Sequence, residues 1–251
     1  MLKKLKSVSK APALPLVLKT IVLSGFLVWI KFGDGSRLIH VFLFVSLALF
    51  FYLQPLINFR KLLFSFLVFL TLFLFFVFQQ TAPLSHPIFS IMVVFGLSAA
   101  FYLILGIKNL IFVDRRSFYF LLNNLLLFLI FLFFFSAESH FSLLNYFLFF
   151  AAVFLITGEF LRFLIAGQSS QQRLLFSAFF AFLALQFVWV ITFLPVGFLN
   201  SAALALFFVF VLGDFVIHHL SGTLNRFLIL RDITILIVIT ILVFAASRWS
   251  L

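Results

Sequence analysis

Cysteine is absent from the 251-residue chain. Its absence excludes disulfide bonds, metal sites with thiolate ligands and enzymes that use a cysteine nucleophile. The compartment in which the chain works stays open, because a sequence without cysteine carries no redox signal.

Charged residues are scarce, and acidic residues are the scarcest of them. Charged residues make up 9% of the chain, Asp and Glu together number 6, and hydrophobic residues reach 66%. The mean hydropathy is +1.34. A water-soluble domain of this length would have too little polar surface to cover itself. The composition therefore predicts an integral membrane protein.

Long apolar runs account for most of the chain. A helix needs about 20 apolar residues to cross the bilayer core, with about 17 as the lower limit. Because the runs are continuously apolar rather than alternating, they predict helices rather than barrel strands. We expect an all-α polytopic transmembrane helical bundle of about nine spans in a single domain, residues 1–251. The predicted spans are residues 14–30, 38–54, 62–78, 88–107, 118–135, 143–165, 174–192, 200–219 and 232–247.

The first span has an alternative interpretation. Lys19 interrupts its apolar sequence. A lysine near the start of a span can reach back to the headgroups, which keeps the nine-span prediction. In the alternative, residues 11–30 lie along the membrane interface and eight spans remain.

Proline is missing from the middle of every predicted span. The six prolines lie in the N-terminal region, at span ends or in loops. Interrupted helices build many transporter binding sites, and proline often causes the interruption. Its distribution here weakens the prediction of a transporter without excluding one.

Basic residues alternate along the loops and predict the orientation. The loops near residues 79–87, 136–142 and 193–199 contain no Lys or Arg. The intervening loops carry Arg60 and Lys61, then Lys108, Arg115 and Arg116, then Arg162 and Arg173, and finally Arg226 and Arg231. Cytoplasmic loops carry the excess of Lys and Arg, so the N-terminus is expected in the cytoplasm and the C-terminus outside. Trp29, Trp189 and Trp249 then fall near the outer interface, although Lys31 and Arg37 also fall on that side.

Glu159 and Asp214 are acidic residues inside apolar spans, toward the predicted cytoplasmic side. A charge at membrane depth is costly, so such residues usually face the bundle interior or a water-filled cavity. The two acids have similar neighbours at an offset of 55 residues, Gly-Glu-Phe at 158–160 and Gly-Asp-Phe at 213–215. This suggests that hairpin 118–165 and hairpin 174–219 are parallel repeats. Chance similarity between apolar sequences is the alternative.

Polar neighbours of these acids leave several interpretations open. Arg162 and His218 lie three and four residues after the two acids, so each pair shares one helix face. In one interpretation, each acid is neutralised by its neighbour and the pair anchors its helix near the headgroups. In the second, the acids form a proton- or cation-handling layer with Asn123, Asn124, His218 and His219 at similar depth. A headgroup- or substrate-binding role is the third.

Recognisable catalytic and metal-binding motifs are absent from the sequence. No H-x-x-x-H or H-E-x-x-H spacing, nucleophile elbow or phosphate-binding glycine loop is present. His218 and His219 are adjacent and would point about 100° apart on a helix, which does not suit two ligands of one ion. We predict no catalytic residue, no metal and no cofactor.

Two features of the span at 174–192 concern packing. Ser177, Ala181 and Ala184 follow the spacing i, i+4, i+7, which predicts a small-residue face that a neighbouring helix can approach closely. Gln186 is expected to make an interhelical hydrogen bond.

The sequence favours a non-catalytic membrane scaffold or accessory subunit, and it does not predict an enzyme. The alternative is a small secondary transporter or proton-coupled carrier that uses the intramembrane acids. An enzyme acting on lipid-linked substrates is a third class, but no catalytic set supports it. With cations at span ends and a net charge of +11, the expected partners are the bilayer's anionic headgroups on the cytoplasmic side, and no nucleic acid. A membrane-protein partner is also expected, and the expected location is a bacterial cytoplasmic membrane.

Overall fold

The computed structural model describes seven stretches of the chain. They are residues 13–33, 37–54, 62–78, 86–112, 114–137, 142–164 and 169–246. Within these ranges the chain forms nine helices and no strand, as the apolar runs predict. The helices are α2 (Ala13–Phe32), α3 (Arg37–Leu53), α4 (Leu63–Phe78), α6 (Pro87–Lys108), α7 (Arg115–Ser136), α8 (Leu143–Leu164), α9 (Ser170–Ile191), α10 (Phe198–Leu220) and α11 (Arg226–Ala246).

Six of these helices are long and apolar enough to cross a membrane, namely α2 and α6 to α10. The α3 and α4 helices have 17 and 16 residues, which corresponds to about 25 Å of helix and is short of a hydrocarbon core of about 30 Å. The α11 helix begins six residues before its predicted span and carries Arg226, Arg231 and Asp232 in its first two turns. These six helices support an integral membrane protein. By length and apolar composition, six of the nine predicted spans qualify among the described residues.

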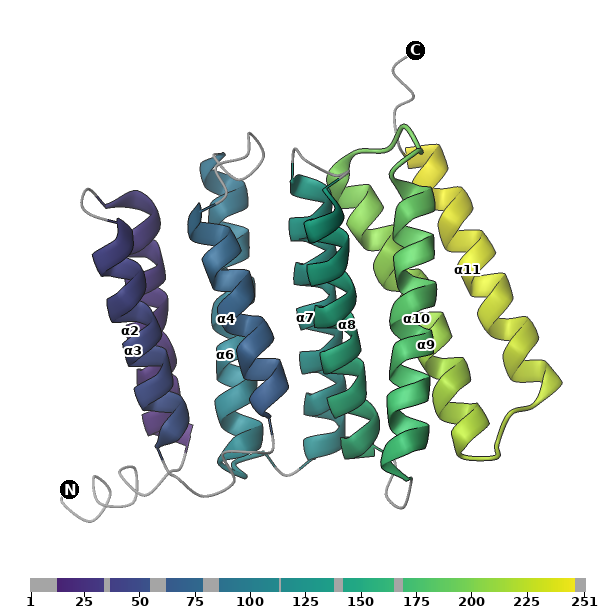
Figure 1. The fold of residues 1–251 in the computed structure, drawn as a ribbon, viewed down its shortest axis with the longest axis horizontal. Helices are drawn as coiled ribbons and strands as arrows, with labels where there is room; N and C mark the ends of the chain where they lie inside the picture. Colours follow the sequence, from purple (N-terminus) through teal and green to yellow (C-terminus); the bar gives the residue numbers. More distant parts are fainter. Residues whose placement is uncertain are drawn as a thin grey trace, which may run out of the picture. The chain divides into compact units, whose positions relative to one another are not determined.

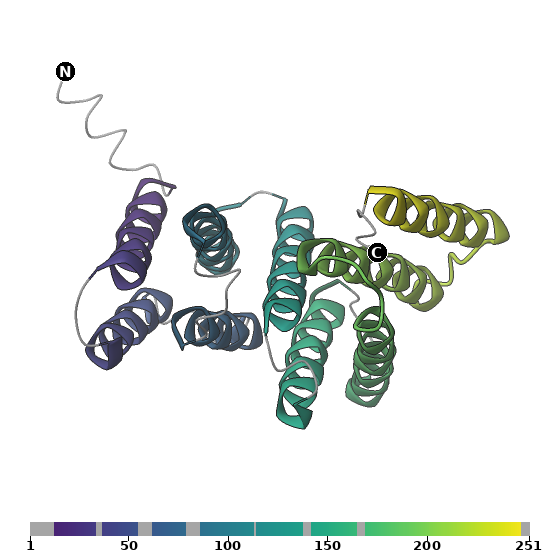
Figure 2. The same cartoon turned by 90° about the horizontal axis from the view of Figure 1, so that it is seen from above.

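Residue contacts divide the chain into two compact units, residues 1–122 and 123–251. In the first unit, α2 packs against α3 and α6, and α4 packs against the same two helices. Figures 1 and 2 show these helices side by side. Phe44 of α3 stacks on Phe73 of α4 with 3.7 Å between ring centroids. The Ser24 hydroxyl of α2 donates to the Ser98 hydroxyl of α6 at 2.8 Å.

Two lysines are held at one end of the first unit. Lys108 is the last residue of α6, is 1% exposed, and donates a hydrogen bond to the Tyr52 carbonyl in the last turn of α3. Its Nζ also lies 4.5 Å from the centre of the Tyr52 ring. The last carbonyls of a helix have no partner inside that helix and favour a nearby cation. Lys108 was counted with the loop that follows the predicted span at 88–107, but it is the last residue of α6 and is buried. Lys19 keeps its Nζ 5.5 Å from the Phe51 ring.

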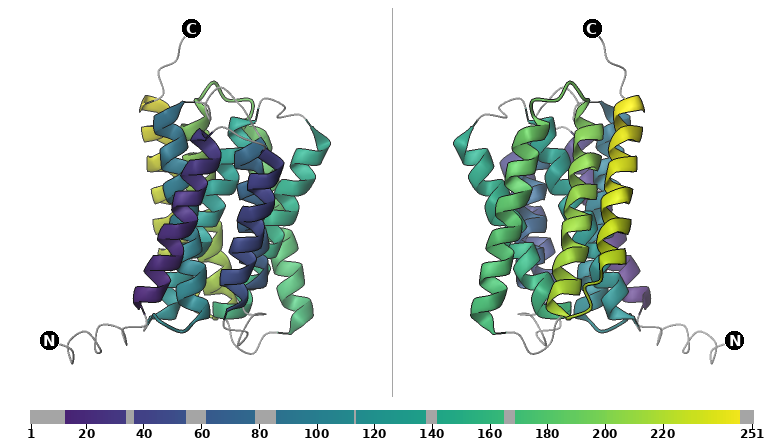
Figure 3. Two further views of the ribbon diagram at one scale, coloured as in Figure 1. Left: turned by 90° about the vertical axis from the view of Figure 1, so that its left-hand side faces the viewer. Right: turned by 90° about the vertical axis from the view of Figure 1, so that its right-hand side faces the viewer.

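In the second unit, α9 packs between α8 and α10, and α10 packs between α9 and α11. Figure 3 shows α11 alongside α10 in the right-hand view. The predicted small-residue face of α9 is confirmed, because Ser177, Ala181 and Ala184 are at most 1% exposed. A Cβ at Gly158 of α8 would lie 3.6 Å from the Ser177 hydroxyl, so two small residues meet where α8 crosses α9. Gln186 is exposed instead, and its expected interhelical hydrogen bond is absent among the described residues.

Candidate functional site

Asp214 lies six residues before the end of α10, about 9 Å along the helix axis. A Cβ at its neighbour Gly213 would meet the Phe180 ring of α9 at 3.9 Å. Because consecutive helical residues point about 100° apart, Asp214 is directed away from that contact and toward α11. Its Oδ1 lies 3.7 Å from Nε2 of His218, one turn later in the same helix. The structure thus brings together the predicted pair of Asp214 and His218.

Arg231 of α11 joins Asp214 to a second acid. Its Nη2 donates to Oδ2 of Asp214 at 3.0 Å and lies 2.7 Å from Oδ1 of Asp232. Its Nε also donates to Oδ1 of Asp232 at 2.7 Å. The same guanidinium nitrogen contacts both carboxylates, so these two acids lie side by side. We call Asp214, His218, Arg231 and Asp232 the α10–α11 cluster.

Asp232 is the member of this cluster that sequence reasoning missed. Its side chain is 6% exposed, and its buried Oδ2 has no hydrogen-bond partner. Arg231 was assigned to a loop, which is also wrong, because α11 begins at Arg226. The feature of the sequence that could have identified Asp232 is the adjacent Arg and Asp at the start of an apolar run, because an acid at that position needs a neutralising partner.

A turn at Gly222, just after α10, places a hydroxyl group beside the second ring nitrogen of His218. Gly222 has φ +67°, in the left-handed region, and its N–H donates to the His219 carbonyl at 3.1 Å. The Thr223 N–H donates to the His218 carbonyl at 3.0 Å, which completes a Schellman turn. This turn brings the Thr223 hydroxyl to 2.8 Å from Nδ1 of His218. Both ring nitrogens of His218 therefore have a polar neighbour.

The α10–α11 cluster contains more acidic groups than permanent cations. Its carboxylates are Asp214 and Asp232, and Arg231 supplies its one permanent cation. Two neighbouring carboxylates repel each other when both are ionised, and one guanidinium contacts both of them here. The side chains of Asp214 and His218 are 28% and 30% exposed, so the neighbouring helices do not fully enclose either one.

The other predicted site residues lie outside this cluster. Glu159 is buried in α8 at 5% exposure, next to the Gly158 contact with α9. Arg162 is exposed, and the ion pairs among the described residues do not include one between it and Glu159. Asn123 is buried and its Oδ1 has no hydrogen-bond partner, whereas Asn124 is partly exposed. No described contact of the α10–α11 cluster reaches any of these four residues.

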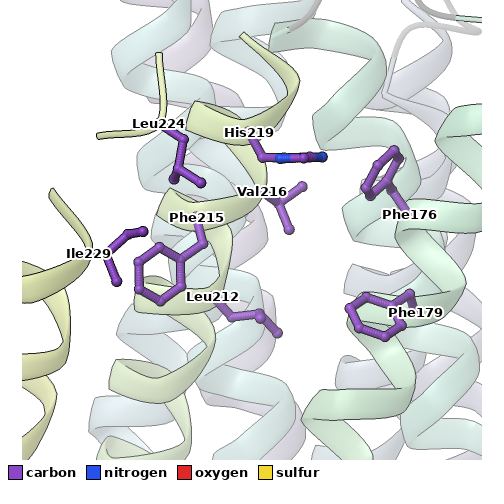
Figure 4. Close-up of a pocket in the computed structure, with 8 residues that line it drawn as sticks. All are labelled: Phe176, Phe179, Leu212, Phe215, Val216, His219, Leu224 and Ile229. Carbon is purple, nitrogen blue, oxygen red and sulfur yellow. The ribbon is translucent and has the colours of Figure 1, made fainter. Parts of the chain in front are cut away.

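A cleft of about 410 Å³ lies between α9, α10 and α11. Figure 4 shows the His219 ring facing Phe176, and the two ring centroids are 6.2 Å apart. Asp214 does not line the cleft, and no lining residue is acidic. His218 and His219 therefore point to different environments, as their adjacency predicts. The lining residues are Phe176, Phe179, Leu212, Phe215, Val216, His219, Leu224 and Ile229.

Metal-binding geometry is not found in the part of the chain that the structure describes. No three His, Asp or Glu side chains there come together as a metal site. Comparison with known proteins finds no matching family model, no matching curated protein and no matching solved structure. Functional inference therefore rests on the geometry of the α10–α11 cluster and of the cleft.

Proposed function

We propose that this chain is a non-catalytic scaffold or accessory subunit of a membrane complex. The observation that carries the proposal is the Arg231 bridge between Asp214 and Asp232. Intramembrane acids that serve transport normally face a substrate or ion pathway. Here Arg231 of α11 contacts both Asp232, its neighbour in the same helix, and Asp214 of α10, which is an arrangement suited to holding α10 and α11 together.

The described contacts of Asp214 do not include Glu159, which also favours a structural role. A carrier built on matched hairpins would place Glu159 and Asp214 at one shared site near the repeat interface. Asp214 instead contacts His218 and Arg231, and Glu159 is buried beside the α8–α9 crossing. The duplication of hairpins 118–165 and 174–219 stays a prediction.

An accessory subunit should have a partner with a fixed stoichiometry. The test is extraction of the tagged chain from its own membranes in mild detergent, followed by native mass spectrometry. We expect one heteromeric mass that persists on dilution, and we expect the partner's abundance to fall when the chain is deleted and to recover when it is restored. A tagged, unrelated membrane protein is the control. A monodisperse chain without a partner, together with an unchanged membrane proteome after deletion, would contradict the proposal.

A proton-coupled carrier is the second candidate, and Asp232 supports it. Its buried Oδ2 has no hydrogen-bond partner and belongs to a carboxylate pair that can share a proton. The test is proton flux into vesicles containing the purified chain. Loss of flux in Asp232→Asn and in Asp214→Asn, but not in the exposed control Asp114→Asn, would establish this function. Absence of flux in the parent chain would dismiss it.

We also propose that the chain crosses a bacterial cytoplasmic membrane nine times, with its N-terminus in the cytoplasm. The alternation of basic loops supports this orientation. Because the chain contains no cysteine, single substitutions can report the side of each loop. Arg116→Cys at the start of α7 should resist a membrane-impermeant maleimide in intact cells, and Gly197→Cys before α10 should react. Both positions are exposed in the structure, so the opposite labelling pattern would invert the topology.

A further inference from the structure

We propose that the cleft between α9, α10 and α11 binds one acyl chain of an anionic phospholipid, with its headgroup beside Arg173 and Arg226. The inference goes beyond the proposed scaffold function, since it concerns a specific lipid site and holds with or without a protein partner. It rests on the shape of the cleft, on its apolar lining and on the position of the cations at one end.

The lining of the cleft fits a hydrocarbon chain. Seven of its eight lining residues are apolar, and His219 is the exception. The volume of about 410 Å³ is in the range of small-molecule pockets, about 300–1,000 Å³. From Leu212 to His219 the lining follows α10 for seven residues, or about 10 Å. A partner helix about 10 Å across with its side chains would occupy more volume over this length than the cleft of about 410 Å³ provides.

The open side of the cleft gives an acyl chain a route from the bilayer. Phe179 and Leu224 line the cleft and remain 55% and 41% exposed. Figure 4 shows Phe176 and Phe179 on one side of the opening, and Phe215 with Ile229 on the other. A water-soluble ligand would find only the His219 ring as a polar partner. A lipid tail needs no polar partner along its length.

Cations gather at the end of the cleft where α9 and α11 begin and α10 ends. Arg173 precedes Phe176 by three residues in α9, and Arg226 precedes Ile229 by three residues in α11. Residues three apart share a helix face, so each arginine extends a lining face by one turn, about 4.5 Å. His219 adds a third basic group at this end. The nearby acids, Asp214 and Asp232, are already bound by Arg231.

This charge distribution selects an anionic headgroup over a zwitterionic one. Each Lys or Arg near a membrane surface strengthens the binding of anionic lipid by an amount that corresponds to about fivefold in affinity. The two arginines together should favour phosphatidylglycerol over phosphatidylcholine on the order of 25-fold. A headgroup at this end also matches the predicted cytoplasmic side.

The test uses the full-length chain in nanodiscs that contain equal parts of phosphatidylglycerol and phosphatidylcholine. One lipid at a time carries a photoreactive diazirine near the middle of an acyl chain, and cross-linked peptides are mapped by mass spectrometry. We expect cross-links on the peptides that contain Phe179 and Phe215, and far more from phosphatidylglycerol. Equal labelling by both lipids, or labelling spread evenly over all exposed helices, would overturn the proposal.

Variants separate the headgroup from the tail. Arg173→Gln with Arg226→Gln should abolish the preference for phosphatidylglycerol, whereas the Lys versions of both should keep it. Arg115→Gln with Arg116→Gln is the matched control, because both arginines are exposed at the start of α7, in the other unit. Arg173 and Arg226 lie in the first turns of α9 and α11 and are at least partly exposed, so their replacement leaves the apolar lining of the cleft in place. An unchanged preference after loss of Arg173 and Arg226 would reject the site.

Discussion

Leu110 and Gly222 occupy the same position in two Schellman turns, and exchanging their residue types tests the backbone argument directly. Leu110 follows α6 with φ +59°, and Gly222 follows α10 with φ +67°. After α6, the Ile111 N–H donates to the Gly106 carbonyl at 3.0 Å and the Leu110 N–H donates to the Ile107 carbonyl at 3.2 Å. This is the hydrogen-bond pattern that Gly222 and Thr223 form after α10. The two turns differ in the residue at the left-handed position, which is a leucine after α6 and a glycine after α10.

The expected magnitude follows from the cost of the left-handed conformation. A residue with a Cβ pays about 1–2 kcal/mol there, and glycine gives back about 0.4–1 kcal/mol through the greater entropy of the unfolded chain. Leu110→Gly should therefore raise the free energy of unfolding by about 0.5–1 kcal/mol, and Gly222→Leu should lower it by a similar amount. A Cβ at Gly222 meets nothing within 4 Å, so backbone strain acts there without a clash.

Thermal unfolding of the purified chain in detergent measures both variants. A change of this size corresponds to a shift in Tm of about 1–4 °C, upward for Leu110→Gly and downward for Gly222→Leu. Leu110 is 43% exposed, so loss of its side-chain contacts should only partly offset the gain. Shifts of the same sign in the two variants would refute the reasoning.

Three further predictions concern packing, capping and a buried cation. Gly158→Leu should lower the free energy of unfolding by about 1–3 kcal/mol in a denaturant titration, because the leucine side chain would be forced into α9. The control Gly25→Leu should leave the free energy of unfolding unchanged, because a side chain at that position meets open space. Hydrogen bonds from the hydroxyl and the backbone N–H of Ser117 hold the pKa of Asp114 below its ordinary value of 3.8. The contribution of Asp114 to stability is therefore full above pH 3.8 and is lost as the pH falls through the lowered pKa. The Tm deficit of Asp114→Ala should accordingly be present at neutral pH and vanish in strong acid; a deficit that grows with acidity would contradict this cause. Lys108→Met should cost about 1–3 kcal/mol by the same titration, because it removes a buried charged hydrogen bond to the Tyr52 carbonyl at the end of α3. Lys31→Met should cost less, since the contact described for that cation is with an aromatic ring, and equal losses would contradict the capping role.

Helix positions could be predicted from the sequence because they depend on short-range properties. Apolar runs give the helices, and loops or polar residues end them. The face formed by Ser177, Ala181 and Ala184 was predictable for the same reason, since the helical repeat alone places these residues together. The pair of Asp214 and His218 is likewise set by a spacing of four residues.

Contacts between helices could not be predicted in the same way. Arg231 and Asp214 are 17 residues apart, and their contact depends on how α10 packs against α11 and where α11 begins. With the predicted span starting at residue 232, Arg231 falls in a loop and Asp232 falls at the boundary of the span, where its contact with Arg231 is not apparent. Lys108 presents the same difficulty, because its burial depends on the last turn of α3, which is far away in sequence. Helix ends are the least certain positions in a prediction from sequence, and these charged residues lie there.

A double-mutant cycle on Asp214 and Arg231 tests the central claim most directly, namely that this pair holds α10 to α11. The free energy of unfolding would be measured for the parent, Asp214→Asn, Arg231→Gln and the double variant. Hydrogen bonds between charged groups contribute about 1.5–3 kcal/mol, and the 46% exposure of Arg231 lowers the expected coupling to about 1 kcal/mol. We expect Asp214→Asn to destabilise the parent and to be neutral or stabilising once Arg231 is replaced, because two unpaired carboxylates then repel each other. Equal effects of Asp214→Asn in both backgrounds would contradict the structural role of this bridge.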